Sequence, residues 1–600
     1  MFKSKQRLFT AVFALFMVLA LTFAVSASWP SFQNTNTNNG VIDPTNNGIP
    51  NTTTSPPNTP PTPGTQGPTP SSTVTLPNVG AWTGVDAVSI INSNVIYTVY
   101  NSGTAPDPLL PPVQSTPLVG QGGARIQATN LTNGAQIWNM ELFDGNATSP
   151  YDIHANNVSQ LSTPIYVNGY LYAAKTATTV FNKATVSLVS GSASANVTIA
   201  QSVSTILVQS DLAGTGTYTV TLTNTLTGKS YTLVPSGTAF SGSYGTYYTY
   251  NGGQIPAGTY TLTLAATGGT SISYISLSRF DWALYSINIA NGTPTRVAFG
   301  EGQANTPINT DSSYIYWGIW GGDRSYYQLP VGATTSTNLK KYTPSGNPYT
   351  PDGKDDFYGA GAVIVGGYVY FGSDSGTLYK VDVATFTARS SLYLHAGGYL
   401  GTGSGEIRST LVYYNNLLYF TMDGGGVTGY LVSIDINFGN PLSSRALPAT
   451  SVSTPVISDN GYVYVGWNGY STTTFTSVGG VMGIQAGFTG RGGTTGLFPV
   501  YTGDPVQSSP IVYSARTGLP ASYTDYVYFT TNADHTYDVT PVTNHNGYCY
   551  QVGGVGTGSP SPSLTWNPAT GGTYALQGFS SDGGYLVYGD DGNTLYIFNP

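Results

Sequence analysis

The chain has 600 residues, and only 8% of them are charged, against roughly 25% in an ordinary soluble protein. Nineteen Lys and Arg against 27 Asp and Glu give a formal net charge of −8. Because this balance offers no basic surface, we expect no nucleic-acid binding. Glycine and tyrosine are abundant (75 and 46 residues), whereas the helix formers Glu, Lys and Arg are scarce. The composition favours an all-β protein over an α-rich or doubly wound α/β protein.

Residues 1–27 have the pattern of a secretory signal peptide. Basic residues precede an apolar run from Leu8 to Val25, and small residues then suit cleavage before Ser28. The run is near the lower limit for a membrane span, so an uncleaved anchor is the alternative. The single cysteine, Cys549, rules out a disulfide within the chain. We expect a secreted or cell-surface protein with no membrane span after signal cleavage.

A repeated unit runs from about residue 80 to the end of the chain. Ser-Thr-Pro-Ile at 162–165 precedes Gly-Tyr-Leu-Tyr at 169–172, and Ser-Thr-Pro-Val at 453–456 precedes Gly-Tyr-Val-Tyr at 461–464. Each copy predicts two short strands around a tight turn, and several copies continue into a second hairpin. Repeated four-stranded units are typical of propeller blades. We expect eight blades, or seven if one weak copy is a loop.

The last unit ends at Pro600 without an obvious fourth strand. A ring must close, and closure by both termini would leave few free sheet edges. The missing strand is therefore expected from the N-terminal side, either near 72–76 or from the segment around Trp29.

One gap between repeats is too long for a blade. From Tyr172 to Tyr316 there are 144 positions, about 100 more than a blade needs. The excess alternates Thr, Tyr and Leu and is divided by Gly turns, which predicts an antiparallel β-sandwich inserted into the second blade.

These patterns divide the chain into six predicted parts. They are the signal peptide (1–27), an N-terminal Trp segment (28–41), a Pro-, Thr- and Asn-rich linker (42–76), the first propeller part (77–182), the inserted sandwich (183–278) and the second propeller part (279–600).

The repeats resemble those of pyrroloquinoline-quinone-like (PQQ-like) β-propellers. The residues that carry the resemblance are Ala-Arg-Ile-Gln-Ala-Thr-Asn-Leu-Thr-Asn-Gly-Ala-Gln-Ile-Trp at 124–138, looser copies at 283–292 and 376–385, and Trp-Pro-Ser-Phe at 29–32. The resemblance implies the fold of the quinoprotein alcohol dehydrogenase-like superfamily. Its catalytic members carry PQQ and calcium, usually with a vicinal Cys-Cys disulfide that one cysteine cannot form. Only Trp138 stands at the family's repeated Trp position, so the resemblance implies the non-catalytic branch and no PQQ.

An acidic loop is the candidate metal site. Asp352, Asp355 and Asp356 lie close together beside Gly353, and carboxylates on such a loop can supply the oxygen ligands of calcium. The spacing does not match an EF-hand loop. A solvated loop is the other interpretation, and no cofactor is firmly implied.

A tyrosine cluster in the insert is the candidate ligand-binding site. Tyr244, Tyr247, Tyr248 and Tyr250 lie within seven positions, and aromatic rings commonly stack on sugars or anchor protein interfaces. Ile-Pro-Ala-Gly-Thr-Tyr at 255–260 also resembles a strand of carbohydrate-binding jelly rolls. The alternative is that these tyrosines pack inside a purely structural sandwich.

No Gly-x-Ser-x-Gly elbow or phosphate-binding loop stands in the context that its chemistry requires. We therefore expect a secreted, non-enzymatic binding or scaffold propeller whose partner is an extracellular polysaccharide or a surface protein. The alternatives are a PQQ- and calcium-dependent quinoprotein dehydrogenase and a carbohydrate-active propeller enzyme.

Overall fold

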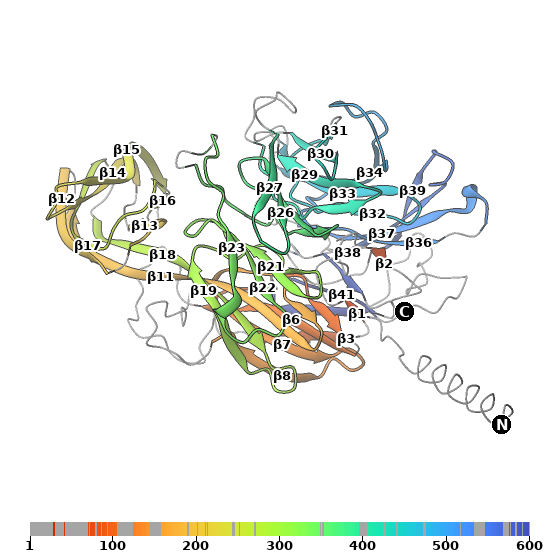
Figure 1. The fold of residues 1–600 in the computed structure, drawn as a ribbon, viewed down its shortest axis with the longest axis horizontal. Coiled ribbons are helices and arrows are strands. Elements are labelled where there is room, and N and C mark those ends of the chain that lie inside the picture. Colours follow the sequence, from red (N-terminus) through yellow and green to blue (C-terminus); the bar gives the residue numbers. More distant parts are fainter. Residues whose placement is uncertain are drawn as a thin grey trace, which may run out of the picture.

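The computed structural model contains β-strands and two 3-10 helices, η1 (Ser336–Asn338) and η2 (Pro520–Ser522), with no α-helix among the residues it describes. The described residues are 28–29, 41–42, 70, 72–77, 81–85, 87–92, 94–104, 124–143, 158–188, 191–200, 202–210, 212, 214–242, 246–250, 252–268, 272–348, 350, 353–394, 405–423, 428–439, 442–471, 476–515, 518–532, 547–567, 575, 578–581, 585–590 and 592–598. Figure 1 shows a large body of short sheets and, at one end, a smaller lobe joined to it by long strands. No helix in the described ranges is long and apolar enough to cross a membrane.

Four consecutive sheets share one plan, an antiparallel four-stranded meander whose strands lie in chain order. Their strands are β20 (Asn309–Thr310), β21 (Tyr314–Gly318), β22 (Tyr326–Pro330) and β23 (Lys340–Tyr342); β24 (Val363–Val365), β25 (Tyr368–Phe371), β26 (Thr377–Asp382) and β27 (Ala388–Tyr393); β28 (Val412–Tyr414), β29 (Leu417–Asp423), β30 (Gly429–Asp435) and β31 (Ser443–Ala446); and β32 (Val456–Ile457), β33 (Tyr462–Ser471), β34 (Thr476–Gln485) and β35 (Phe498–Gly503). This repeated meander confirms the predicted all-β propeller class.

Two further sheets each hold a short strand from the N-terminal segment. One contains β1 (Ser28–Trp29), β4 (Ala81–Gly84), β5 (Ile90–Asn92), β6 (Val95–Thr104), β7 (Ala124–Asn130) and β8 (Gln136–Glu141). The other contains β2 (Val41–Ile42), β36 (Ile511–Ala515), β37 (Thr524–Thr530), β38 (Gly547–Gly553) and β39 (Ser561–Trp566). The β2–β36 pairing is parallel, and every other pairing between described strands is antiparallel.

The last sheet joins the two ends of the chain. Its order is β3 (Ser72–Thr75), β42 (Thr594–Phe598), β41 (Leu586–Gly589) and β40 (Ser580–Ser581). Val74 lies opposite Leu595 in the antiparallel β3–β42 pair. The predicted contribution of a strand from 72–76 is confirmed, so the end of the predicted linker belongs to a sheet. The Trp29 segment pairs with β5 instead, where Trp29 lies opposite Ile91.

Neighbouring sheets share hydrophobic cores. Between β18 (Ile272–Ile287) and β21, the rings of Trp282 and Trp317 lie 5.9 Å apart. Another core combines Ile91 and Ile96 of the N-terminal part with Leu586 and Tyr588 near the C-terminus. Inward-facing alternate residues of each strand thus pack against the next sheet, as in a propeller.

The remaining large sheet extends from this body into the smaller lobe. Its strands are β9 (Val158–Leu161), β10 (Ile165–Val167), β11 (Tyr170–Leu188), β13 (Ile206–Ser210), β16 (Thr246–Tyr250), β18 and β19 (Pro294–Glu301). Strands β11 and β18 pair along most of their lengths. The predicted insert boundaries, 182/183 and 278/279, therefore fall inside two strands that connect the body and the lobe (Figure 1).

The lobe has a second layer, a four-stranded sheet in the order β12 (Gly191–Ile199), β17 (Gly258–Gly268), β14 (Gly214–Asn224) and β15 (Ser230–Gly242). One core contains side chains from both layers, including Leu222 and Leu264 of this sheet and Leu277 of β18. The lobe thus has a hydrophobic core of its own.

Candidate functional site

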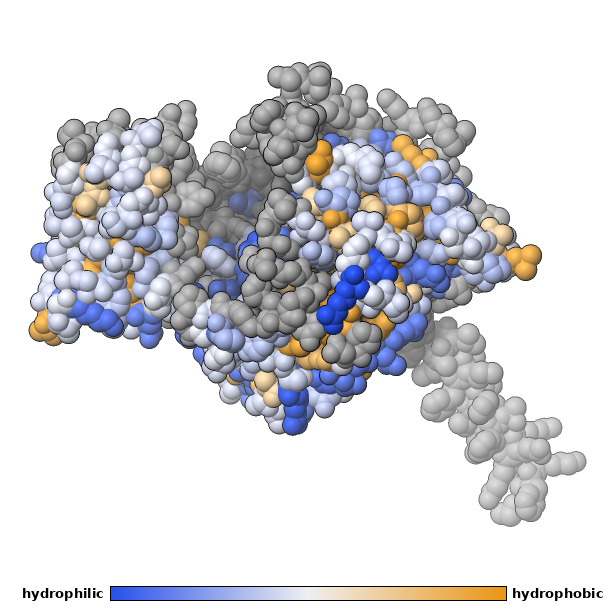
Figure 2. All heavy atoms as spheres, turned by 90° about the horizontal axis from the view of Figure 1, so that it is seen from above, coloured by the Kyte–Doolittle hydropathy of each residue, from blue (hydrophilic) through white to orange (hydrophobic). Residues whose placement is uncertain are grey.

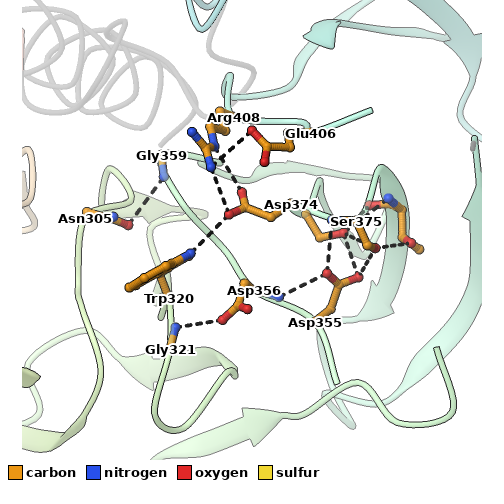
Figure 3. Close-up of polar contacts among 12 residues, drawn as sticks. Asn305, Trp320, Gly321, Asp355, Asp356, Gly359, Asp374, Ser375, Glu406 and Arg408 are labelled. Atoms are coloured by element: carbon orange, nitrogen blue, oxygen red, sulfur yellow. Dashed lines mark hydrogen bonds and ion pairs between the residues drawn. The ribbon is translucent and has the colours of Figure 1, made fainter. Parts of the chain in front are cut away.

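Charged and aromatic side chains meet beside the β20–β23 and β24–β27 sheets, in a chain that has few charges. We call this group the Asp374 cluster (Figure 3). Its members are Trp320, Asp356, Tyr358, Asp374, Glu406 and Arg408, of which Figure 3 labels all but Tyr358. They come from the loop after β21, the loop before β24, the turn between β25 and β26, and the loop before β28. Strand directions alternate in an antiparallel meander, so the loop that enters the first strand and the turn that follows the second strand lie at the same end of the sheet. The four segments therefore meet at one end of adjacent sheets.

Asp374 is at the centre of the cluster. Arg408 approaches both of its carboxylate oxygens at 3.4 Å, and Trp320 donates its indole N–H to Oδ2 over 3.1 Å. Arg408 also lies 3.1 Å from Glu406, with 33% of the Arg408 side chain and 29% of the Glu406 side chain exposed. The group is therefore hydrogen-bonded internally and still partly exposed to solvent.

Burial changes the acidity of both carboxyl groups. It raises the pKa of Asp374 from 3.8 to about 7, although the Arg408 charge and hydrogen bonds oppose the rise. Burial also raises the pKa of Glu406, again against the effect of Arg408. Asp374 thus exchanges its proton near neutral pH, which suits either a hydrogen-bond donor or a general acid.

Aromatic rings border these charges. The Arg408 guanidinium lies 4.9 Å from the centre of the Tyr358 ring, and the rings of Trp320 and Tyr358 meet edge to face at 6.2 Å. Both rings are partly exposed. Rings beside carboxylates and a guanidinium can contact the C–H faces of a sugar while the polar groups bind its hydroxyls.

The turn that presents Asp374 depends on a glycine. Gly376 has a φ of 74°, in the left-handed region. A Cβ at this position would collide with the carbonyl oxygen of Gly405, next to Glu406. The β25–β26 turn and the loop before β28 can therefore approach each other only because residue 376 has no side chain.

Of the three predicted calcium residues, Asp355 and Asp356 can be placed, and their carboxylates point into different networks (Figure 3). Asp352 lies outside the described residues. Asp355 is buried and accepts hydrogen bonds from Asn347, Ser373, Ser375 and Tyr379 at 2.6–2.9 Å.

Asp356 points into a different network, where Oδ1 accepts a hydrogen bond from the Gly321 N–H at 2.7 Å and lies 3.4 Å from Arg324. Within the described ranges, no three Asp, Glu, His or Cys side chains could together hold a metal ion.

The predicted tyrosine site belongs partly to the core of the lobe. Tyr250 is 8% exposed, and Tyr248 is partly buried against the same core. Tyr247 lies on β16, but its side chain is outside the described residues, as is all of Tyr244. The two side chains that can be placed thus support the packing of the lobe.

Sequence reasoning missed the Asp374 cluster. Ser373-Asp374-Ser375 reads as a hairpin turn, and Arg408 as the start of a repeat unit. The rarity of charge could have revealed it, because charged residues are only 8% of the chain. The repeat pattern places Asp356, Asp374, Glu406 and Arg408 in turns and loops at the same end of neighbouring units.

No protein-family model and no curated protein matches the sequence. Among solved structures, a europium-containing methanol dehydrogenase is similar, with 10% identity and a TM-score of 0.38 over 84% of this chain and 90% of its own. A quinohemoprotein alcohol dehydrogenase from Pseudomonas putida HK5 has 11% identity and a TM-score of 0.38, over 84% of this chain and 76% of its own. That of Comamonas testosteroni has 10% identity and a TM-score of 0.37, over 84% and 77%. TM-scores below 0.5 at such identities say nothing about activity.

Proposed function

We propose that this chain is a secreted or surface-attached, non-enzymatic propeller that binds an extracellular polysaccharide at the Asp374 cluster. One observation carries the proposal: two aromatic rings contact an ion pair. Trp320 and Tyr358 lie against Asp374 and Arg408, and all four side chains are partly exposed. A sugar offers apolar C–H faces and hydroxyl groups, and this combination of rings and charges complements both. A surface protein is the other partner class, since Trp, Tyr and Arg also dominate protein interfaces.

The proposal includes the architecture. The eight sheets other than the β12–β17–β14–β15 sheet would be the blades of one ring, with the lobe as a sandwich inserted into the second blade. The sharing of one core by Ile91, Tyr528 and Tyr588 supports closure between the first and last sheets. Within the family that the repeats resemble, this function corresponds to the non-catalytic branch.

The test compares glycan binding of the purified full chain with two variants. We expect Trp320→Ala and Arg408→Ala each to weaken binding about tenfold, because each removes a central contact. Arg389→Ala is the control, since Arg389 forms a similar but more exposed pair with Asp382 at 3.0 Å. Glycan arrays and cell-wall pull-downs that are both empty for the wild type would refute the polysaccharide proposal.

A carbohydrate-active enzyme is the second candidate, favoured by the raised pKa of Asp374 beside Glu406. Glycoside hydrolysis uses a pair of carboxyl groups, one of which keeps its proton near neutral pH. Release of reducing sugar from a bound polymer, abolished in Asp374→Asn, would establish this alternative.

A PQQ- and calcium-dependent dehydrogenase is the remaining alternative. It predicts that the melting temperature rises only when PQQ and calcium are added together. A ligand that binds the folded chain at a hundred times its Kd adds about 2.7 kcal/mol to the free energy of unfolding.

A further inference from the structure

The outward face of the four-stranded sheet in the lobe is covered with hydroxyl groups. The strands β12, β17 and β14 present five hydroxyl side chains and one carboxamide in two rows across the sheet, which we call the hydroxyl face. One row is Ser194, Thr263 and Thr221, and the other is Asn196, Thr261 and Thr223. Within each row the residues lie directly opposite one another. The face is thus an ordered array rather than a chance collection of polar residues.

Strict alternation along the strands produces the array. Thr221 stands between Val220 and Leu222, and Thr263 stands between Leu262 and Leu264, and these four apolar residues are at most 1% exposed. A shift of one residue would bury the hydroxyls and expose the core, so the register is strongly specified. Neighbouring strands lie about 4.8 Å apart and alternate residues about 6.8 Å apart, which makes a two-dimensional lattice of side chains.

Lateral hydrogen bonds hold several of these hydroxyls in place. Ser194 and Thr263 lie 3.2 Å apart, Thr223 and Ser230 2.9 Å apart, and the flanking pair Thr217 and Thr267 2.7 Å apart. Each hydroxyl can donate one hydrogen bond and accept two, so a lateral pair retains capacity for a partner lying on the sheet. The array is therefore both ordered in advance and able to bind.

The partner that suits this face is uncharged. Lys183, Asp211 and Lys229 are the only charged residues from 183 to 278, and none lies in the two rows. In Figure 2 the lobe is mostly pale, which marks residues of near-neutral hydropathy. Its one strongly exposed large apolar residue among those described, Leu226, lies in the β14–β15 turn and not in either row. The six residues of the two rows therefore offer an ionic polymer no counter-charge, and they offer a protein no aromatic or apolar side chain.

We propose that the hydroxyl face binds a neutral polysaccharide in an insoluble, ordered form, with its chains lying flat on the sheet. The proposal rests on the proposed polysaccharide-binding function and adds the physical state of the ligand. One exposed hydrogen bond contributes little, so a short soluble sugar gains almost nothing on a flat face. An ordered polymer surface repeats its hydroxyls and can engage many positions at once.

The lobe is also tied to the body close to the Asp374 cluster. Glu301 Oε1 accepts hydrogen bonds from the backbone N–H groups of Ser204 at 2.8 Å and Thr205 at 3.0 Å. The Gly322 N–H donates to Thr205 Oγ1 over 2.9 Å, and the preceding Gly321 N–H donates to Asp356 of the cluster. These bonds fix the connection between β12 and β13 of the lobe against the body, next to Asp356 of the cluster.

The experiment measures binding of the full chain to microcrystalline cellulose and to chitin by depletion from solution, beside soluble oligosaccharides of the same sugars. The test variant is Thr221→Val with Thr263→Val, which preserves side-chain shape and strand propensity while removing two opposed hydroxyls. The matched control is Thr295→Val with Thr502→Val, two exposed threonines on β19 and β35 of the body. Melting temperatures check that both variants are folded.

We expect the Thr221/Thr263 variant to bind the insoluble polymer about tenfold more weakly, with the control unchanged. Equal binding by both variants would overturn the proposal, as would wild-type binding to soluble oligosaccharides without binding to either solid polymer. If Trp320→Ala weakens polymer binding while the Thr221/Thr263 variant binds like the wild type, the hydroxyl face is refuted and the proposed function stands. If the wild type binds no carbohydrate in any form, both fail.

Discussion

Trp320 donates its indole N–H to the Asp374 carboxylate over 3.1 Å, although the two residues lie 54 positions apart. This bond joins the loop after β21 to the turn between β25 and β26, and so connects two adjacent sheets. Arg408 reaches the same carboxylate from a third segment at 3.4 Å. Asp374 therefore organises the cluster, and its protonation state has consequences for both stability and binding.

Asp374 is expected to make stability depend on pH. Its pKa is raised to about 7 by burial, so the folded chain holds this proton more tightly than the unfolded chain does. The resulting stabilisation is lost as the pH rises from about 4 to about 7. We expect Asp374→Asn to raise the melting temperature relative to wild type more at pH 8 than at pH 4. Asp382→Asn is the control, because the pKa of Asp382 is lowered to about 2 and that residue stays ionised over this range. The same difference at both pH values would contradict the assignment.

Asp355 should be a strong determinant of stability. Its carboxylate accepts hydrogen bonds from Ser373, Ser375 and Tyr379 in a buried site. Asp355→Ala leaves these donors without their acceptor, and we expect a loss of about 3–5 kcal/mol in the free energy of unfolding. Chemical denaturation should show less than about 1 kcal/mol for Asp459→Ala, an exposed aspartate in a turn. Similar losses for both variants would mean that the network contributes little.

The pairing of β3 with β42 is expected to stabilise the whole body. Val74 packs against two cores, one of which contains Leu595, whereas the adjacent Thr73 is exposed. A carboxylate at position 74 would be desolvated without a partner, so Val74→Asp should cost about 2–3 kcal/mol, and Thr73→Asp under about 1 kcal/mol. The melting temperatures of the two variants test this prediction. If the Val74→Asp protein is as stable as the Thr73→Asp protein, β3 does not complete the last sheet.

Gly376 should be required for both stability and binding. Ala at this position needs a left-handed φ and collides with the Gly405 carbonyl, so we expect Gly376→Ala to cost about 2–4 kcal/mol and to weaken glycan binding. Gly367→Ala separates the strain of the left-handed φ from the collision, because Gly367 has a φ of 81° but open space around its Cβ position. It should lose about 1 kcal/mol and bind normally. Normal binding by Gly376→Ala would show that the turn does not position Asp374.

The contribution of the sequence is clearest where the signal is local. Alternation of polar and apolar residues predicted the strands, and Ser-Thr-Pro followed by Gly-Tyr marked the repeated hairpins. The strand near Val74 was also predictable, because a ring built from four-stranded units lacked one strand at its end. Each of these inferences depends on neighbouring residues or on the count of repeats.

Tertiary structure alone decided which side chains meet. Asp355 and Asp356 are adjacent in sequence, yet the extended chain turns their carboxylates into different networks. Trp320, Asp374 and Arg408 are far apart in sequence, yet the stacking of neighbouring sheets brings three separate segments together. Periodicity specifies the face on which a residue lies, but contacts between loops depend on sheet twist and packing distance, which no short stretch of sequence encodes.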